Sequence, residues 1–231
     1  MSETVTFTID GREITASIGQ TIVQAARQHG IYIPTLCYLH DVVAPGTCRI
    51  CTVKVNGRTT SACTTHALQG IVVENDTPEL NEMRKAIVEM LYVEGNHFCP
   101  SCEKSGMCEL QALAYRFQIF APRFDYSFSQ RSINAFSPKL LIDYNRCVLC
   151  RRCVQAIRTE DGTPLFAFTN RGNKTSITID LELAAKMSDE QAQKAMNICP
   201  VGAIIHKEQG FITPIGQRKY DHQPIGSDIT C

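Results

Sequence analysis

Cysteine is the residue most able to do chemistry in this 231-residue chain, and eleven of its twelve cysteines fall into three groups. Clustered thiols in a protein without a secretion signal bind metal more often than they form disulfides. The chain begins without a basic segment, and no apolar run is long enough to cross a bilayer. We therefore expect a soluble, cytoplasmic protein whose clustered thiols bind metal.

The first group consists of Cys37, Cys48, Cys51 and Cys63. Two of these thiols share a short loop that contains Gly46, and two flank it, which suits the two irons of a [2Fe–2S] cluster. Plant-type ferredoxins use Cys-x4-Cys-x2-Cys, whereas the first gap here is ten residues. A four-cysteine zinc site is the alternative, but such sites usually combine two close cysteine pairs and this group has one. The group therefore predicts a [2Fe–2S] site.

The second group consists of Cys99, Cys102 and Cys108. Three thiols leave a [4Fe–4S] cluster one ligand short. His97 lies two residues before the group and is the candidate for the fourth ligand, although a lone histidine is more often structural. His40 and His66 are the alternatives. An imidazole in place of a thiolate removes negative charge and should raise the reduction potential of the cluster.

The third group joins a Cys-x2-Cys-x2-Cys run to a remote Cys-Pro and consists of Cys147, Cys150, Cys153 and Cys199. Three cysteines spaced three residues apart can set their thiolates around three corners of a [4Fe–4S] cubane. Two-cluster ferredoxins carry this run twice, and each final cysteine serves the other cluster. The positions expected for a second cluster are Ile157, Asp189, Ala192 and Ala195, so all four of its ligands are missing. We therefore predict a ferredoxin-like domain that retains one of two [4Fe–4S] sites.

The apolar pattern divides the chain into three predicted domains, which span residues 1–77, 78–137 and 138–231. The first and third mix strands with helices and the second is helical, so the predicted fold class is α+β. Domains this small gain much of their stability from a metal site. Cys231 belongs to none of the three groups, and we expect it to be a free terminal thiol.

In the first domain, the turns Asp10-Gly11 and Asn56-Gly57 each separate apolar runs, which predicts two β-hairpins. A short helix is expected over residues 21–27 and one more strand over 71–73. Hairpin, helix, hairpin and strand in this order indicate a β-grasp fold around the predicted [2Fe–2S] site.

The second domain is predicted to begin with a helix at Thr77-Pro78. Its core face is expected to contain Leu80, Met83, Ile87, Met90 and Leu91. Another helix should follow Cys108, and residues 122–138 should form a loop. In the third domain, strands are predicted at 140–142, 176–179 and 203–205. A helix should begin at Ser188, and the tail from Gly210 looks like an extension that contacts a partner.

The order of the three groups resembles the N-terminal iron–sulfur region of the large subunit of respiratory complex I, over nearly the whole chain. The chain is also similar to the free-standing iron–sulfur subunits of NAD-reducing [NiFe] hydrogenases. We expect no molybdopterin-type or hydrogen-activating iron domain after residue 231, and the missing second ferredoxin cluster disfavours [FeFe] hydrogenases. The spacing His97-x-Cys99 also looks like the hydrogenase subunit, because the complex I relatives have His-x3-Cys.

This resemblance implies a hetero-oligomer in which the chain relays electrons between a [NiFe] hydrogenase, with its small and large subunits, and a flavoprotein diaphorase subunit. The overall reaction would be the reversible conversion of H2 and NAD+ to NADH and H+. By resemblance, the [2Fe–2S] site lies toward the flavoprotein, the His97 site lies toward the hydrogenase, and the Cys147 site relays between them. FMN, NAD and the Ni–Fe centre are expected on the partner subunits.

No catalytic residue is expected on this chain, because the sequence has no nucleotide-binding glycine loop and no nucleophile–base pair. A formal net charge of zero argues against a nucleic-acid partner. Two alternatives remain open. One is a separate subunit of a complex I-like NADH dehydrogenase or an NAD-dependent formate dehydrogenase, and the other is a zinc-stabilised interaction module without redox activity.

Overall fold

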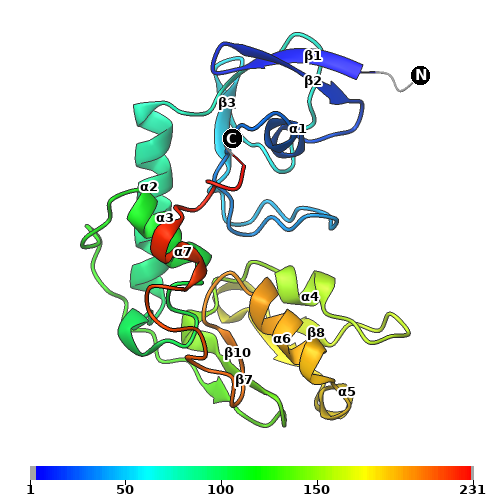
Figure 1. Cartoon of the computed structure of the whole chain (residues 1–231), viewed down its shortest axis with the longest axis vertical. Coiled ribbons are helices and arrows are strands. Elements are labelled where there is room, and N and C mark those ends of the chain that lie inside the picture. The colour runs from blue at the N-terminus through cyan, green and yellow to red at the C-terminus, as the bar shows by residue number, and fades with distance from the viewer. Residues whose placement is uncertain (1–3, 230–231) are drawn as a thin grey trace.

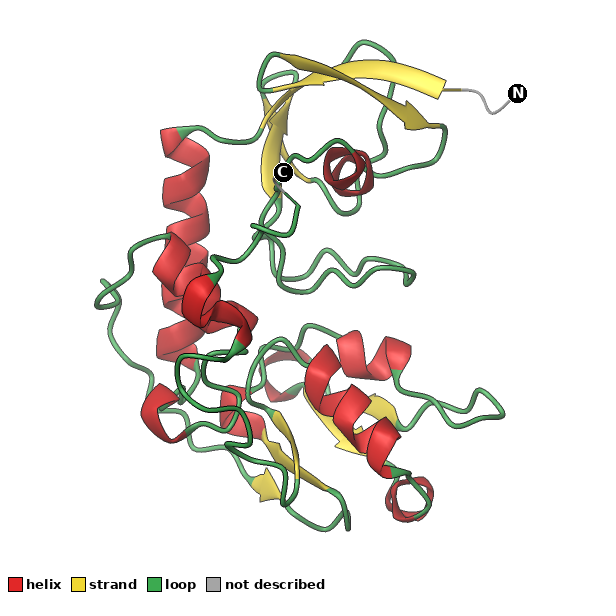
Figure 2. Ribbon diagram, in the orientation of Figure 1, coloured by secondary structure: helices red, strands yellow, loops and turns green. Residues whose placement is uncertain are grey.

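The computed structural model describes residues 4–229, in which ten strands form three sheets and seven α-helices accompany them (Figures 1 and 2). The strands are β1 Thr4–Ile9, β2 Arg12–Ser17, β3 Thr52–Val55, β4 Arg58–Ser61, β5 Val72–Glu74, β6 Ile133–Asn134, β7 Leu140–Asp143, β8 Phe166–Thr169, β9 Ser176–Ile179 and β10 Ile204–His206. The helices are α1 Ile22–Gln28, α2 Pro78–Glu94, α3 Glu109–Arg116, α4 Arg152–Ala156, α5 Leu181–Ala185, α6 Asp189–Ile198 and α7 Lys219–His222. Within the described range, no helix has the length and apolarity needed to span a membrane.

The first sheet has the strand order β2-β1-β5-β3-β4, and α1 packs against it as the β-grasp prediction requires (Figure 1). Strands β1 and β5 are parallel, and the other neighbouring pairs are antiparallel. Both predicted hairpins are present. Asp10 and Asn56 have φ values of 49° and 48°, and the glycine after each also has positive φ, as a two-residue hairpin turn needs.

Helix α2 begins after Thr77, whose hydroxyl accepts a hydrogen bond from the Leu80 amide. The predicted core face of this helix is partly wrong, because Met83 and Met90 are 37% and 46% exposed. Arg84 and Glu89 are buried instead. Both side chains have tertiary partners for their charged groups, so they can be buried. The spacing of apolar residues in the sequence does not reveal such partners.

The third part of the chain has a sheet of order β10-β7-β6 and a separate β8-β9 hairpin. Ser188 caps α6 in a capping box with Gln191, as predicted. Strand β6 lies inside the segment that we expected to be a loop, and it pairs with β7. A two-residue strand has no sequence period, and only its pairing with β7 defines it.

The described residues form two hydrophobic cores. One lies inside the β-grasp sheet, and the other is formed mainly by the helical region and the third part of the chain, with Tyr32, Leu36 and Ile50 of the β-grasp domain joining it. Ile157, Ala192 and Ala195 are at most 2% exposed in the shared core. Asp189 lies at the exposed start of α6 and pairs with Lys139. The positions that would serve a second cubane are therefore three core side chains and a surface carboxylate.

Two irregular segments connect the β-grasp domain to the remainder of the molecule (Figure 1). The loop between α1 and β3 approaches α4, where the Gln155 Nε2 donates to the Val43 carbonyl at 2.7 Å. The tail from Gly210 runs back along α3 to the β-grasp domain. The Arg116 guanidinium donates to the Ile225 carbonyl at 3.2 Å, and Asp228 lies 3.6 Å from Arg27. The tail therefore packs on its own chain, and Cys231 lies outside the described residues.

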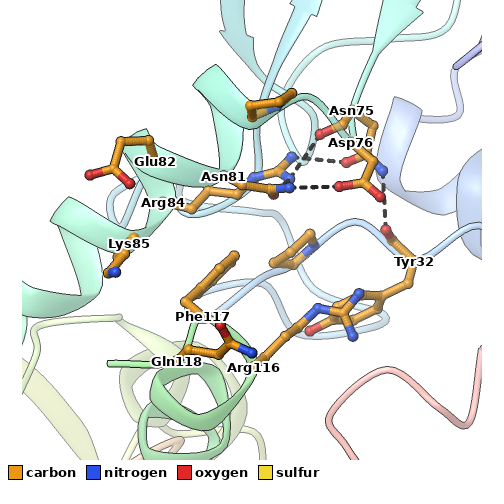
Figure 3. A pocket seen from close by; sticks show the side chains of 12 residues that line it. Tyr32, Asn75, Asp76, Asn81, Glu82, Arg84, Lys85, Arg116, Phe117 and Gln118 are labelled. Atoms are coloured by element: carbon orange, nitrogen blue, oxygen red, sulfur yellow. Dashed lines mark hydrogen bonds between the residues drawn. The ribbon is translucent and has the colours of Figure 1, made fainter. Parts of the chain in front are cut away.

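A polar cleft of about 520 Å³ separates the β-grasp domain from α2 and α3 (Figure 3). Arg84 extends from α2 on one side of the cleft and hydrogen-bonds to Asn75. On the other side, the Arg116 guanidinium stacks 4.5 Å from the centre of the Tyr32 ring. None of the cysteines within residues 4–229 lines this cleft, so the candidate metal centres lie elsewhere.

Candidate metal centres

The four cysteines of the first group converge in the β-grasp domain. Cys37, Cys51 and Cys63 are each 1% exposed, and Cys48 is half-buried. Their thiols hydrogen-bond in the order Cys48–Cys37–Cys63–Cys51. These bonds lower the pKa values of Cys37 and Cys51 and raise those of Cys48 and Cys63. The structure thus places four sulfur donors side by side, which is the donor set of a [2Fe–2S] cluster.

The loop that carries Cys48 and Cys51 turns tightly. Gly46 has φ of 64°, and a Cβ atom there would lie 2.9 Å from the Thr64 side chain. Arg49 also adopts a left-handed conformation, with φ of 59°. Its carbonyl accepts a hydrogen bond from the Thr52 hydroxyl. These conformations bring the two cysteines of the loop to the same side as Cys37 and Cys63.

The second group lines a small enclosed pocket together with His97. The lining residues are Tyr92, His97, Phe98, Cys99, Cys102, Ser105, Cys108, Gln111, Arg146 and Gly202. Cys102 and Cys108 are each 8% exposed. The backbone at Gly202 approaches so closely that an added Cβ atom would lie 2.3 Å from the Cys102 sulfur. The structure therefore brings together the three cysteines and the histidine that the sequence singled out.

The imidazole of His97 has one free nitrogen. Its Nε2 atom is buried and has no hydrogen-bond partner among residues 4–229. The ring bonds to the Leu91 carbonyl, so that bond is made by Nδ1. Burial lowers the pKa of His97 to about 4, which keeps the ring neutral at pH 7. A neutral imidazole with one nitrogen fixed by a carbonyl and the other free is the usual arrangement of a metal-ligating histidine.

Three further residues of this pocket were not recognised from the sequence. The Tyr92 ring packs edge-on against His97 at 5.4 Å, and its hydroxyl hydrogen-bonds with the Cys99 thiol. The Arg146 guanidinium donates to the Cys102 sulfur at 3.5 Å, and the Gln111 amide donates to the Cys108 sulfur at 3.5 Å. Of these three residues, only Arg146 could have been suspected from the sequence, because it directly precedes a cysteine of the third group.

The two alternative histidines lie away from this pocket. His40 is exposed and pairs with Asp41 at 2.6 Å. His66 is exposed and forms a bridge with Thr21 in the β-grasp domain. Neither lines the pocket that Cys99 and Cys108 share with His97.

The third group gathers where α4 and α6 meet. Burial raises the pKa of Cys147 to about 11, and it raises the pKa values of Cys150 and Cys153 as well. A negative charge on Cys199 also raises the pKa values of all three thiols, so Cys199 lies close to them. The intervening residues Leu149 and Arg151 have φ values of 50° and 68°. Such left-handed residues cost about 1–2 kcal/mol each, so their presence indicates a loop shaped for its thiols.

The second and third groups are neighbours. Arg146 directly precedes Cys147 of the third group and reaches Cys102 of the second. Arg152, beside Cys153, forms a bidentate ion pair with Glu109, beside Cys108, at 2.6 and 2.7 Å. A buried bidentate pair of this kind fixes the relative position of the two loops.

Mononuclear zinc has no support in this geometry. Among residues 4–229, no three histidine, cysteine, aspartate or glutamate side chains meet closely enough to hold a single metal ion. A zinc ion needs its ligands within about 2.3 Å of one point, whereas an iron–sulfur cluster distributes its ligands over several irons.

Comparisons with known proteins agree with these donor sets. A 2Fe-2S iron-sulfur cluster binding domain matches residues 2–78. The NADH-ubiquinone oxidoreductase-G iron-sulfur binding region matches residues 84–123, and the ferredoxin-like domain of NADH-quinone oxidoreductase subunit 3 matches residues 137–205. Fold and sites together define an iron–sulfur protein with 2Fe-2S and 4Fe-4S binding domains. The predicted fold class is confirmed.

Full-length relatives narrow this class. The chain is 48% identical over 222 residues to the NAD-reducing hydrogenase HoxS subunit gamma of Cupriavidus necator, covering 96% of this chain and 95% of that one. It matches a crystal structure of NAD+-reducing [NiFe]-hydrogenase in the H2-reduced state with a TM-score of 0.89 and 40% identity, covering 96% of each chain. The chain belongs to the family of the gamma subunits of NAD-reducing hydrogenases, as the resemblance predicted.

A more distant relationship extends to respiratory enzymes. The chain is 31% identical over 211 residues to the mitochondrial NADH-ubiquinone oxidoreductase 78 kDa subunit of Candida albicans. That match covers 90% of this chain but 29% of the relative. Of these two relatives, the chain thus spans nearly all of the hydrogenase subunit and less than a third of the respiratory one.

Proposed function

We propose that this chain is the electron-transfer subunit of an NAD-reducing [NiFe] hydrogenase, between the hydrogenase module and a flavoprotein diaphorase subunit that binds FMN and NAD. The reaction of the complex would be the reversible oxidation of H2 by NAD+. The identity to the Cupriavidus necator subunit over 95% of that subunit supports this proposal. The cytoplasmic location and the predicted domain limits, 1–77, 78–137 and 138–231, stay predictions.

We assign one cluster to each group of ligands. The [2Fe–2S] ligands are Cys37, Cys48, Cys51 and Cys63, the ligands of one [4Fe–4S] cluster are His97, Cys99, Cys102 and Cys108, and those of the other are Cys147, Cys150, Cys153 and Cys199. The observation that carries this assignment is the His97 Nε2 atom, which is buried without a partner among residues 4–229 in the same pocket as three cysteines. An unpartnered buried nitrogen is costly unless a ligand satisfies it.

Clusters in these sites would supply one-electron oxidation and reduction. The residues of the chain hold them, exclude water and adjust their potentials. Tyr92, Arg146 and the Gln111 amide direct hydrogen-bond donors at the sulfur atoms of the His97 site. Such bonds stabilise thiolate and raise the reduction potential of a cluster.

The contacts of the third group support its role as the intermediate relay. Arg146, next to Cys147, reaches Cys102 in the second group. Gln155, two residues after Cys153, reaches Val43 in the loop between the first two cysteines of the first group. Residues next to the third group therefore contact Cys102 of the second group and the loop of the first, which suits a path from the [2Fe–2S] site through the Cys147 site to the His97 site.

The test begins with the wild-type chain, purified anaerobically with its co-expressed partners. We expect about ten irons for this chain, from one [2Fe–2S] and two [4Fe–4S] clusters, with EPR signals of both types after reduction. Replacement His97→Ala should lower the count to about six, whereas His97→Cys should retain about ten and lower the potential of that cluster. Zinc without iron would overturn the electron-transfer function, and full iron in His97→Ala would overturn the histidine ligand.

Activity measurements distinguish the loss of electron transfer through this chain from the loss of its partner subunits. Cys150→Ser should abolish the reduction of NAD+ by H2 and leave the oxidation of NADH by artificial acceptors largely intact. Equal loss of both activities would mean that the variant disrupts the complex. Co-purifying nickel–iron subunits support the hydrogenase assignment, whereas molybdenum subunits or a respiratory NADH dehydrogenase would replace it with the respective alternative.

A further inference from the structure

Buried cations near the [4Fe–4S] sites differ in what neutralises them. Lys104 and Arg152 are each 4% exposed, and the Arg146 side chain is 17% exposed. A buried charge is strongly destabilising unless an opposite charge compensates it. The group that neutralises each buried cation therefore indicates which negative charges lie around it in the folded protein.

The two arginines are neutralised by carboxylates. Arg152 forms its bidentate pair with Glu109 at 2.6 and 2.7 Å. Arg146 lies 3.0 Å from Asp143 and 3.5 Å from Glu103. Each arginine thus has its counter-charge within the polypeptide.

Lys104 has no such partner. Its Nζ atom donates to the Met196 carbonyl at 2.7 Å, and it forms no ion pair with any carboxylate of residues 4–229. Burial lowers the pKa of Lys104, and the negative charges that oppose this effect are, in order, those of Cys199, Cys108 and Glu109. Since Glu109 is already paired with Arg152, the remaining negative groups are cysteines of the third and second ligand groups.

The path of the side chain explains this position. Lys104 lies in the loop between Cys102 and Cys108, and its side chain crosses to the last turn of α6, which delivers Cys199. A lysine that donates to a late carbonyl of a helix is a common C-terminal cap. Capping accounts for the hydrogen bond but leaves the buried positive charge without a counter-charge in the protein.

We propose that the Lys104 ammonium is the shared counter-charge of the two [4Fe–4S] sites and raises the reduction potentials of both. This inference rests on the proposed assignment of the ligand groups. A thiolate-bound cluster carries net negative charge, and one-electron reduction makes it more negative. A fixed ammonium between two such sites therefore favours the reduced form of each.

The test is an EPR-monitored redox titration of the Lys104→Gln variant in the full complex, beside the wild type. Glutamine keeps a donor for the α6 carbonyl and removes the charge. We expect a roughly tenfold decrease in the equilibrium constant for reducing each [4Fe–4S] cluster, which corresponds to about 59 mV for one electron. The [2Fe–2S] potential should not move. Lys104→Arg should retain both [4Fe–4S] potentials because it keeps the charge.

Lys139→Gln is the matched control, since Lys139 pairs with Asp189 at the opposite, exposed end of α6. It should leave all potentials unchanged. A chain with about ten irons and unshifted [4Fe–4S] potentials in Lys104→Gln would overturn this inference alone. Six irons or zinc in the wild type would instead overturn the cluster assignment on which it rests.

Loss of [4Fe–4S] iron is also informative. Should Lys104→Gln and Lys104→Met both lose these clusters while Lys104→Arg keeps them, the positive charge is required for assembly, which supports the proposal. Loss of the clusters in all three variants, Lys104→Arg included, would show that only the shape of lysine matters and would overturn it.

Discussion

The region of the proposed [2Fe–2S] site and the region of the two proposed [4Fe–4S] sites are constructed in different ways. The first ligand group lies in a β-grasp domain that has its own hydrophobic core. The second and third groups share one core, which contains Cys108, Cys153 and Cys199. A change in the β-grasp core should therefore remain local. A change in the shared core, which also includes Tyr32, Leu36 and Ile50 and has Cys48 packed against it, should reach both [4Fe–4S] sites.

The buried cations of the two regions show the same contrast. Arg84, below the first group, is 1% exposed and donates to the carbonyls of Asn75 and Thr52 and to the amide oxygens of Asn75 and Asn81. Among residues 4–229, Lys104 has a single acceptor. Neutral acceptors disperse the charge of Arg84, which extends from α2 to the β-grasp domain, whereas the charge of Lys104 is left to face the cysteines.

The largest effect should come from removing a ligand in the shared core. Cys153→Ser should cost at least four irons per chain and broaden the spectrum of the second [4Fe–4S] cluster, because Cys153 and Cys108 belong to one core. Cys51→Ser should cost about two irons and leave both [4Fe–4S] signals unchanged. Iron analysis and EPR of the two variants provide the comparison. Loss of the [2Fe–2S] signal in Cys153→Ser would contradict the separation of the two regions.

A smaller effect should follow from breaking the buried pair between the [4Fe–4S] sites. Glu109→Gln leaves Arg152 buried without its counter-charge, so we expect the free energy of unfolding of the shared core to fall by about 3 kcal/mol. Anaerobic urea unfolding measures this change. Glu79→Gln is the control, since Glu79 pairs with Lys54 on the surface and its loss should have no measurable effect. Similar shifts in both variants would contradict a special role for the buried pair.

Features that depend on residues close together in the sequence could be predicted from it. Cysteine spacing identified the ligand groups that the structure brings together, and the caps at Thr77 and Ser188 placed the starts of α2 and α6. The exposed Met83 and the buried Arg84 show where this fails, since hydropathy does not reveal that a guanidinium will find carbonyl acceptors.

The supporting residues of the site were beyond sequence reasoning for a related reason. Tyr92 reaches His97 from another element, and Lys104 reaches Met196 across 92 positions of the sequence. Contacts of this kind depend on how the helices and loops pack together. Residue type and spacing specify which atoms can bind a cluster, whereas tertiary packing decides which charges surround it.

The positions where a second cluster would bind are occupied by core side chains, and enlarging one of them should have an effect of intermediate size on stability. Ala195 is fully buried in the shared core, so Ala195→Leu should overpack it and lower the free energy of unfolding by about 1–3 kcal/mol. Lys194→Leu places the same leucine side chain on the exposed face of the same helix and should be close to neutral. Urea unfolding of the two variants distinguishes them. A neutral Ala195→Leu would mean that the space of a second cluster is still partly open.

The smallest effects give the sharpest test of the two regions, because each region has a helix that begins with a capping box. Thr21 and Gln24 cap α1 in the β-grasp domain, and Ser188 and Gln191 cap α6 in the shared core. Alanine at either cap should cost about 1 kcal/mol. If the regions unfold separately, Thr21→Ala lowers only the transition followed by the [2Fe–2S] signal, and Ser188→Ala lowers only that of the [4Fe–4S] signals. If each variant lowers both transitions equally, the C-terminal tail and the loop before β3 join the two cores into one cooperative unit, and the separation drawn from their cores is wrong.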